Sequence, residues 1–508
     1  MNLLKLVSML LGLWIAISVR SQEFIPHSIH REQSEQFKDW NSNEDHEPES
    51  VKNEGSGFIS RQDYKLLTTS YELNASVFGY HPYWSGNAHL EYQWDLLSEL
   101  CYFSYEVDPV TGYPITTHDF LTADAVDSAQ ANAVNVHLCV TLFSNHSTFF
   151  GNPDARQTLI DELIWYIKER NAQGVNMDFE AVPYSMIDDY MLFLADFSQQ
   201  FHNALPGGIV SIAMPAVDWS GLFDVAFMND YIDLYMIMGY DYYWNGSGEA
   251  GPVAPLYSMT GDYNYNLSRT LSYYQSEGMP REKILLGLPY YARQWPTWER
   301  FAPSEVRGSG TAYTYAYVKN NGSGYYSEEN KYWESKSFSN YYSFESNGWN
   351  QCFLEEMFGL GKRYDLVNRH QLAGIGIWAL GYDEGHTELW ELIGKKLTEE
   401  ALPETTATIY DSGGPYWDYY AEEDYSLIIG HESFYRLNLE FFEFALESGY
   451  DSLWIYDGPD TLSPLLGAFS GNELPPTISS TQSFLTLQFK SDAGVQLGGW
   501  EADYHAVL

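Results

Sequence analysis

The sequence predicts an α/β protein: a (β/α)8 TIM barrel with an insertion between its seventh and eighth strands, followed by an all-β sandwich. Between residues 77 and 380, eight apolar runs alternate with helical patterns. This alternation is typical of a parallel sheet that helices cover on its outer face and that closes into a barrel. Beyond residue 404 the pattern changes to short alternating strands without clear helical stretches, which indicates a sandwich of about a hundred residues.

Each strand of the barrel is predicted by its own apolar run. The runs are residues 77–80, 100–105, 134–144, 174–180, 208–214, 233–241, 283–290 and 374–380. Helical periodicity marks residues 123–132, 154–171 and 186–204. With 508 residues and 45% hydrophobic content, the chain has ample apolar material for a barrel core and a second domain.

A tyrosine-rich stretch interrupts the last barrel unit, between the seventh and eighth strands. It includes Tyr313, Tyr315, Tyr317, Tyr325, Tyr326, Tyr332 and Trp333. An insertion there lies on the carboxyl-terminal rim, where the active sites of such barrels lie. The stretch either forms one wall of a cleft or is a self-contained hairpin whose rings pack on each other, and the sequence favours neither.

The N-terminal region is predicted to direct export and then to remain unfolded. Lys5 precedes an uncharged apolar run at residues 6–19, and residues 1–21 have the order of a signal peptide cleaved before Gln22. A buried N-terminal helix is the alternative. Residues 22–72 are polar and charged, so we expect a flexible leader without chemistry. The barrel is then expected at residues 73–402 and the sandwich at 404–508, in a protein that is secreted or on the cell surface.

Composition excludes some partners. The net charge of −43, from 26 basic and 69 acidic residues, argues against nucleic acid or anionic membrane as a partner. The N-terminal apolar run is too short to span a bilayer, and no other segment resembles a transmembrane helix. Three cysteines (Cys101, Cys139 and Cys352) cannot form a disulfide framework. The 17% of aromatic residues suits sugar binding and ordinary packing alike.

The fourth expected strand, residues 174–180, carries the strongest chemical signal. Because side chains alternate across a strand, Asn176, Asp178 and Glu180 share one face, opposite an apolar face. A polar face turned to water is the alternative, but apolar flanks favour a core strand. Burying two carboxylates is costly without a purpose, so the pair is predicted to act as acid and base.

Together with two other strand ends, this strand resembles glycoside hydrolase family 18, the family of chitinases and of related enzymes that cut peptidoglycan or N-glycan cores. The other two ends are Met238-Gly239-Tyr240-Asp241 and the region of Trp378. The family's hallmark is Asp-x-x-Asp-x-Asp-x-Glu. Its last two acids correspond to Asp178 and Glu180, whereas Gln173 and Asn176 stand where the first two are expected.

The resemblance implies a retaining hydrolase of β-1,4-linked N-acetylglucosamine glycans in which the substrate's own N-acetyl oxygen is the nucleophile. Glu180, with a raised pKa, would be acid and then base, while Asp178 and Tyr240 would steady and orient the N-acetyl group. The residues expected to bind the sugar are Tyr80, Met238, Asp241 and Trp378. For Met238 and Trp378, filling the barrel core is a strong alternative. Asn176 is expected to donate a hydrogen bond to Asp178.

The C-terminal region resembles a CUB domain. The motifs are Tyr410-Asp411-Ser412-Gly413-Gly414-Pro415, Ser448-Gly449-Tyr450-Asp451, Ile455-Tyr456-Asp457-Gly458 and Phe489-Lys490-Ser491-Asp492. Many CUB domains bind calcium, which the resemblance places at Glu447, Asp451 and Asp492. Solvated surface acids are the alternative. The domain is expected to bind a protein or glycan ligand, and catalysis is expected to need no cofactor.

Two rival functions remain. A chitinase-like lectin would bind sugar without cutting it, but such proteins usually lose the glutamate, and Glu180 is present. A surface adhesin would use the CUB domain for its function and the barrel only for targeting. The sequence leaves open whether the polymer is chitin, peptidoglycan or another N-acetylglucosamine glycan.

Overall fold

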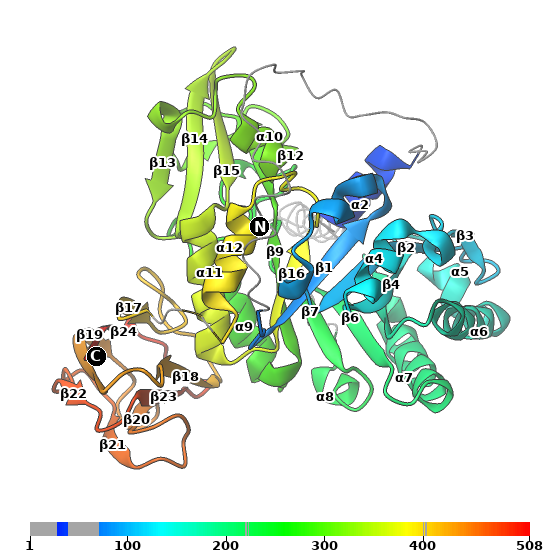
Figure 1. Cartoon of the computed structure of the whole chain (residues 1–508). Coiled ribbons are helices and arrows are strands. Elements are labelled where there is room, and N and C mark those ends of the chain that lie inside the picture. Colours follow the sequence, from blue (N-terminus) through cyan, green and yellow to red (C-terminus); the bar gives the residue numbers. More distant parts are fainter. Residues whose placement is uncertain are drawn as a thin grey trace, which may run out of the picture.

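The computed structural model describes residues 28–38, 71–218, 221, 223–399, 401 and 404–507. The expected signal peptide and most of the expected leader lie outside these residues. Figure 1 shows an α/β barrel and, packed against one side of it, a β-sandwich. Among the described residues, no helix is long and apolar enough to cross a membrane.

Eight parallel strands close into the barrel. They are β1 (Ser76–Pro82), β2 (Glu99–Val107), β4 (Asn135–Leu142), β5 (Gly174–Phe179), β6 (Ile209–Pro215), β7 (Leu234–Met238), β9 (Ile284–Pro289) and β16 (Gly374–Trp378). Neighbours follow the order β1-β16-β9-β7-β6-β5-β4-β2, and pairing of β1 with β2 closes the ring. The predicted barrel is therefore confirmed, and all eight expected strands are present.

Helices form the outer ring around these strands (Figure 1). They are α4 (Asp124–Ala131), α5 (His146–Phe150), α6 (Pro153–Arg170), α7 (Ile187–Ala204), α8 (Val225–Met228), α9 (Leu267–Ser276), α11 (Met357–His370) and α12 (Glu388–Lys396). The bounds follow local chemistry: α6 has Asn152 as its N-cap and Pro153 in its first turn, and it ends at left-handed Asn171. Strand β3 (Pro114–Thr116) pairs antiparallel with β2.

The insertion between β9 and β16 folds into a five-stranded antiparallel sheet. It contains β10 (Tyr291–Pro296), β12 (Thr311–Thr314), β13 (Lys331–Glu334), β14 (Ser339–Glu345), β15 (Trp349–Leu354) and helix α10 (Tyr315–Asn320), while β11 (Ser304–Glu305) pairs with β8 (Glu249–Ala250). Several of its tyrosines stack on other rings, as Tyr313 does on Tyr317 and Tyr325 on Phe344. Of the two alternatives, ring-on-ring packing therefore describes these tyrosines better.

The C-terminal domain is a sandwich of two four-stranded sheets. One sheet has the order β17 (Thr406–Tyr410), β24 (Gly499–Val507), β19 (Arg436–Ala445) and β22 (Ile478–Ser479); the other has β18 (Asp424–Gly430), β23 (Phe484–Lys490), β20 (Ser452–Tyr456) and β21 (Leu465–Phe469). Alternating side chains such as Leu437 and Leu439 fill its core. The predicted all-β sandwich is confirmed.

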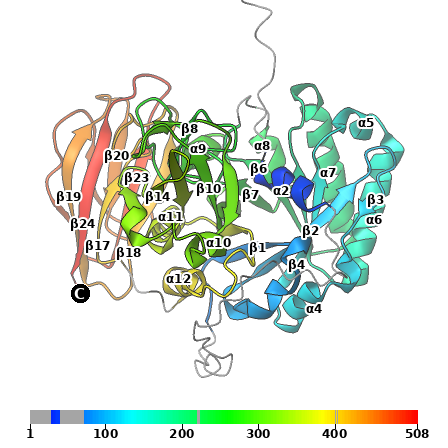
Figure 2. The same ribbon diagram turned by 90° about the horizontal axis from the view of Figure 1, so that it is seen from above.

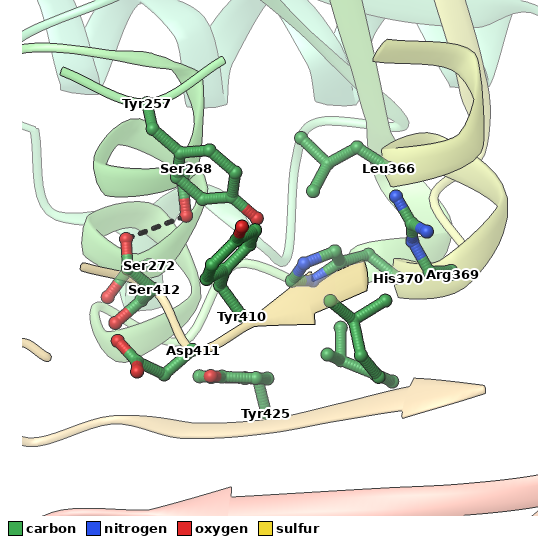
Figure 3. Close-up of a pocket in the computed structure, with 12 residues that line it drawn as sticks. Tyr257, Ser268, Ser272, Leu366, Arg369, His370, Tyr410, Asp411, Ser412 and Tyr425 are labelled. Carbon is green, nitrogen blue, oxygen red and sulfur yellow. Dashed lines mark hydrogen bonds between the residues drawn. The ribbon is translucent and has the colours of Figure 1, made fainter. Parts of the chain in front are cut away.

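Specific contacts join the sandwich to the barrel. The hydroxyl of Ser268, on α9, donates to the carbonyl oxygen of Ser412, and the two oxygens are 2.9 Å apart. The dashed line in Figure 3 marks this hydrogen bond. Tyr257 of the barrel meets Tyr410 of the sandwich edge-on, with ring centroids 5.6 Å apart. The cavity left between these groups has a volume of only about 20 Å³. The interface is therefore closely packed.

The segment expected to be a flexible leader contains an unexpected helix. Residues 29–37 form α2 (Ile29–Phe37), whose N-cap Ser28 accepts a hydrogen bond from the backbone of Arg31. Figure 2 shows α2 lying over the strands of the barrel. For residues 28–38 the expectation of a mobile, inert leader is wrong, because the helix buries Ile29, His30 and Gln33 against the barrel.

Candidate active site

The paired carboxylates lie at the carboxyl end of β5. Asp178 is fully buried and points into the barrel, and Glu180 follows the last strand residue, Phe179. The backbone N–H of Glu180 donates to the carbonyl oxygen of Leu142, which holds the end of β5 against β4. The expected alternation is therefore present, with the carboxylates on the interior face and Phe179 packed among rings outside.

Burial raises the pKa of both carboxyl groups. For Glu180 the largest cause is loss of solvation, and the charge of Asp178 adds to it, while nearby His30 and a hydrogen bond from Ser28 act in the opposite direction. For Asp178 burial again raises the pKa, and a hydrogen bond with Glu180 opposes it. A carboxyl group that stays protonated near neutral pH can serve as a general acid.

Asn176 does not contact Asp178 as expected. Its amide nitrogen donates to the hydroxyl of Ser211, on β6, at 2.9 Å, and its carbonyl oxygen accepts from Tyr80, on β1, at 2.9 Å. Asn176 and Asp178 are two residues apart, so they are separated by roughly 7 Å along the strand. The short amide therefore reaches neighbouring strands and not the next residue on its own face.

The end of β7 supplies three further groups. The hydroxyl of Tyr240 contacts one ring nitrogen of His30, whose other nitrogen contacts Asp178, and Met238 lines the cleft beside Glu180. Asp241 accepts hydrogen bonds from Tyr291 at 2.6 Å and from Arg293 at 3.0 Å. Both partners lie at the start of the insertion, on β10, so the insertion contributes to the site through its base.

Trp378, at the end of β16, forms the floor of the pocket. Its ring lies 5.4 Å from that of Tyr80 and is fully buried. Above it lies the imidazole of His30, stacked at 3.7 Å with an interplanar angle of 28°. Filling the barrel core therefore explains only part of the packing of Trp378, because its indole also stacks on His30, which lies outside the barrel.

Residues of α2 that the sequence did not single out complete the pocket. Nδ1 of His30 lies 2.9 Å from Oδ2 of Asp178, and Nε2 lies 2.7 Å from the hydroxyl of Tyr240. Oε1 of Gln33 accepts from the indole of Trp378 at 2.9 Å. A Ser N-cap was the one sequence signal for this helix, and its buried face is too polar to be found by hydrophobic periodicity.

A cleft of about 830 Å³ opens beside Glu180. Most residues that line it come from the ends of β5 to β7 and from the loops that follow β5 and β7, and they include Glu180, Tyr184, Tyr240, Trp244 and Tyr263. Glu305 on β11 and Ser28, the N-cap of α2, also line it. Concave sites with aromatic walls and a few charged groups are typical of ligand-binding clefts. Glu180 therefore lies where an elongated ligand in the cleft meets the buried pocket over Trp378.

The three acids expected to bind calcium converge in the sandwich. Carboxylate oxygens of Glu447, Asp451 and Asp492 all lie within 4.8 Å of one another. Asp451 also accepts hydrogen bonds from the hydroxyl of Tyr419 and from the backbone N–H of Asp492. A set of oxygen donors alone, two of them accessible to solvent, fits a hard cation such as Ca²⁺.

Comparison with known sequences identifies both domains. Residues 76–383 match the model of Glycosyl hydrolases family 18, and residues 399–504 match that of the CUB domain. A probable endochitinase of Caenorhabditis elegans is 26% identical over 252 residues, covering 45% of this chain and 40% of its own length. A putative sporulation-specific glycosylase of Bacillus subtilis, YdhD, is 26% identical over 249 residues, covering 46% of this chain and 53% of its own. The chain thus spans about half the length of these relatives.

Comparison with solved structures supports the fold. The crystal structure of the Group IV chitinase of Ostrinia furnacalis in complex with allosamidin superposes with a TM-score of 0.56 at 18% identity. The alignment covers 63% of this chain and 97% of that one. At this identity the likeness establishes the shared barrel and no more.

Proposed function

The chain belongs to glycosyl hydrolases family 18, and from this premise we propose that it is a retaining hydrolase of β-1,4-linked N-acetylglucosamine glycans. One observation carries the proposal. Asp178, Glu180 and Tyr240 surround a single buried pocket floored by Trp378. These are the residues that the family resemblance assigns to the reacting sugar.

In the first step Glu180 gives its proton to the glycosidic oxygen while the N-acetyl carbonyl oxygen of the substrate attacks the anomeric carbon. The bond to the leaving sugar breaks and a cyclic oxazolinium forms, so no enzyme carboxylate becomes covalently attached. The raised pKa of Glu180 supports this role, since the acid must still hold its proton when the substrate binds.

In the second step the same Glu180, now ionised, takes a proton from water as the water attacks the anomeric carbon. The bond between this carbon and the N-acetyl oxygen breaks, so the oxazolinium ring opens and the neutral N-acetyl group is restored. Two inversions at this carbon give net retention of configuration. Asp178 stabilises the positive charge that develops on the N-acetyl nitrogen, and Tyr240 holds the carbonyl oxygen in line. Orienting a nucleophile that is already attached to the substrate can account for a large part of the rate enhancement.

We further propose that the protein is exported and that its CUB domain binds calcium and then a protein or glycan ligand. The presence of a CUB domain in an enzyme of this family supports action outside the cell. Convergence of Glu447, Asp451 and Asp492 supports the calcium site, since the three charges would otherwise repel. The bound ion would hold the loops at this end of the sandwich.

The test is one assay on two substrates side by side: soluble chitin oligomers and purified peptidoglycan. Release of reducing ends from either substrate supports the hydrolase and identifies the polymer, and the anomeric configuration of the first product should be retained. Binding of oligomers without release of reducing ends would contradict hydrolysis and favour the lectin. Failure to bind either polymer would contradict the hydrolase and the lectin, and it would also leave the adhesin without a glycan for its barrel to target.

A further inference from the structure

The α2 segment, residues 28–38, occupies the pocket in which the reacting sugar is proposed to lie. The contacts of its residue His30 are to residues of that pocket. His30 contacts Asp178, Tyr240 and Trp378, and its ring nitrogen lies 3.6 Å from a carboxylate oxygen of Glu180. The sequence match to the hydrolase family begins at residue 76, so the segment is not part of the barrel that the family defines.

The imidazole of His30 has the shape and polarity of the group that it excludes. A flat ring stacks on Trp378, as a sugar ring would. Its two nitrogens meet Asp178 and Tyr240, the groups proposed to hold the N–H and the C=O of an N-acetyl group. A neutral imidazole has one N–H donor and one acceptor nitrogen, and an amide has an N–H donor and an acceptor carbonyl oxygen, so His30 can reproduce both hydrogen bonds.

Burial supports the neutral form of His30. Loss of solvation lowers the pKa of His30 to about 4, although the charges of Glu180 and Asp241 oppose this effect. At neutral pH the ring is therefore uncharged. The groups facing it include Asp178, Glu180, Tyr240 and Asp241.

Two further contacts fix the segment over the pocket. Oε1 of Gln33 accepts hydrogen bonds from Trp378 and from the hydroxyl of Tyr382, at 2.9 and 2.7 Å. The carboxylate of Glu32 pairs with one terminal nitrogen of Arg293 at 3.1 Å, and Asp241 pairs with the other. Because Arg293 is fully buried, this pairing stabilises a charge that solvent does not reach.

With α2 in place a sugar ring cannot enter the pocket over Trp378. Asp178 and Trp378 have no exposed surface, Tyr240 is 4% exposed, and only 10% of the Glu180 side chain is accessible. We propose that the α2 segment is a built-in competitive inhibitor, with His30 as a mimic of the substrate's N-acetyl group, and that it must leave the pocket before a glycan reacts. The proposal rests on the proposed function for the identity of the excluded sugar.

The segment is suited to leave without unfolding the barrel. A helix of nine residues is marginal by itself in water, so α2 depends on the pocket for its structure. As part of the same chain it competes at a high effective concentration. The cleft beside Glu180 remains open, so one end of a polymer can bind there first and then displace the helix.

The first experiment compares the full-length protein with the double variant His30→Ala/Gln33→Ala on a soluble fluorogenic N-acetylglucosamine oligomer. An inhibitor in equilibrium with the pocket raises KM and leaves kcat unchanged. If the pocket is free less than a tenth of the time, the variant's KM should fall at least about tenfold. Glu35→Ala is the matched control, because Glu35 lies on the exposed side of α2 and pairs with Arg31. It should leave KM unchanged.

The second experiment does not depend on catalysis. A labelled synthetic peptide of residues 28–38 is titrated into the full-length double variant, and binding is followed by fluorescence anisotropy. The peptide should bind, a chitin oligomer should displace it, and a peptide carrying His30→Ala should bind at least about tenfold more weakly. Both proteins are checked by circular dichroism for the same melting behaviour.

The outcomes separate the two proposals. Equal KM values in the double variant and the wild type, together with no binding of the wild-type peptide, would overturn the inhibitor and leave the hydrolase standing. Peptide binding that oligomers reverse, in a protein that releases no reducing ends, would support the inhibitor and overturn the hydrolase. A fall in KM for Glu35→Ala equal to that for the double variant would also count against the specific mimicry by His30.

Discussion

Two groups of carboxylates converge in this molecule, one at the barrel centre and one at the edge of the sandwich, and their surroundings differ. Asp178 is fully buried, only 10% of the Glu180 side chain is accessible, and both carboxylates lie close to the ring of His30. Glu447, Asp451 and Asp492 are as close together, but Asp492 is exposed and Glu447 is partly so. Enclosure favours protonation of an acid, whereas access to water favours ionised acids joined by a cation. The same residue types therefore suit proton transfer in one place and metal binding in the other.

The largest effect should come from removing the proton donor. Glu180→Gln preserves the size of the side chain but can neither give nor take a proton, so hydrolysis of chitin oligomers should fall on the order of a thousandfold or more. Binding of the same oligomers, measured by calorimetry in the His30→Ala/Gln33→Ala background, should persist. Near-normal turnover would show that another residue is the acid.

Asp178→Asn should be the next most severe change. The amide keeps the shape but cannot stabilise the positive charge on the N-acetyl group, so kcat should fall on the order of a hundredfold. The charge of Asp178 also raises the pKa of Glu180. Without that charge the pKa of Glu180 falls, so the residual activity should be lost at a lower pH on the basic side of the profile. An unchanged basic limb would argue that the two carboxyl groups act independently.

Calcium should act at the other cluster alone. An ion that binds the folded sandwich and not the unfolded chain stabilises the fold by about 2.7 kcal/mol at a hundredfold excess over its dissociation constant. Melting of the full-length protein should therefore shift upward with calcium and downward with chelator, while hydrolysis of soluble oligomers should not change.

Matched variants make the calcium test specific. Asp451→Ala should abolish the calcium-dependent shift, but this residue also holds Tyr419 and the backbone of Asp492. Asp492→Asn is the milder change and should weaken the shift. Asp424→Asn, an exposed acid paired with Lys490, is the control and should leave the shift intact. If neither calcium nor chelator shifts the melting of the wild-type protein, the three acids are ordinary surface charges and not a calcium site.

The sequence predicted the barrel well because its signals are local and apolar. In residues 174–180 polar and apolar side chains alternate, and this alternation reveals both faces of β5. The position of Asp178 and Glu180 at the end of the strand follows from the same pattern. The sequence could not predict the α2 segment, because His30 and Gln33 are buried in a polar pocket and do not contribute to an apolar stripe on the helix. The partner of Asn176 also depends on Ser211, on a neighbouring strand, and no pattern within β5 reveals it.

The smallest effect, and the sharpest test of the contrast between the clusters, should come from Asn176→Asp. This change adds a carboxylate on the same face of β5 as Asp178 and Glu180, and it restores the acid that the family resemblance expects. The new carboxylate can accept hydrogen bonds from Tyr80 and Ser211, which now contact Asn176, so the protein should fold. Its negative charge makes ionisation of Glu180 less favourable, and Glu180 must be protonated to act. The basic limb of kcat/KM should therefore move to higher pH by less than about one unit, with activity retained.

Two results would count against this interpretation. A folded but inactive variant would show that position 176 is misaligned with the family. Calcium binding at the barrel centre would show that enclosure does not separate the two clusters.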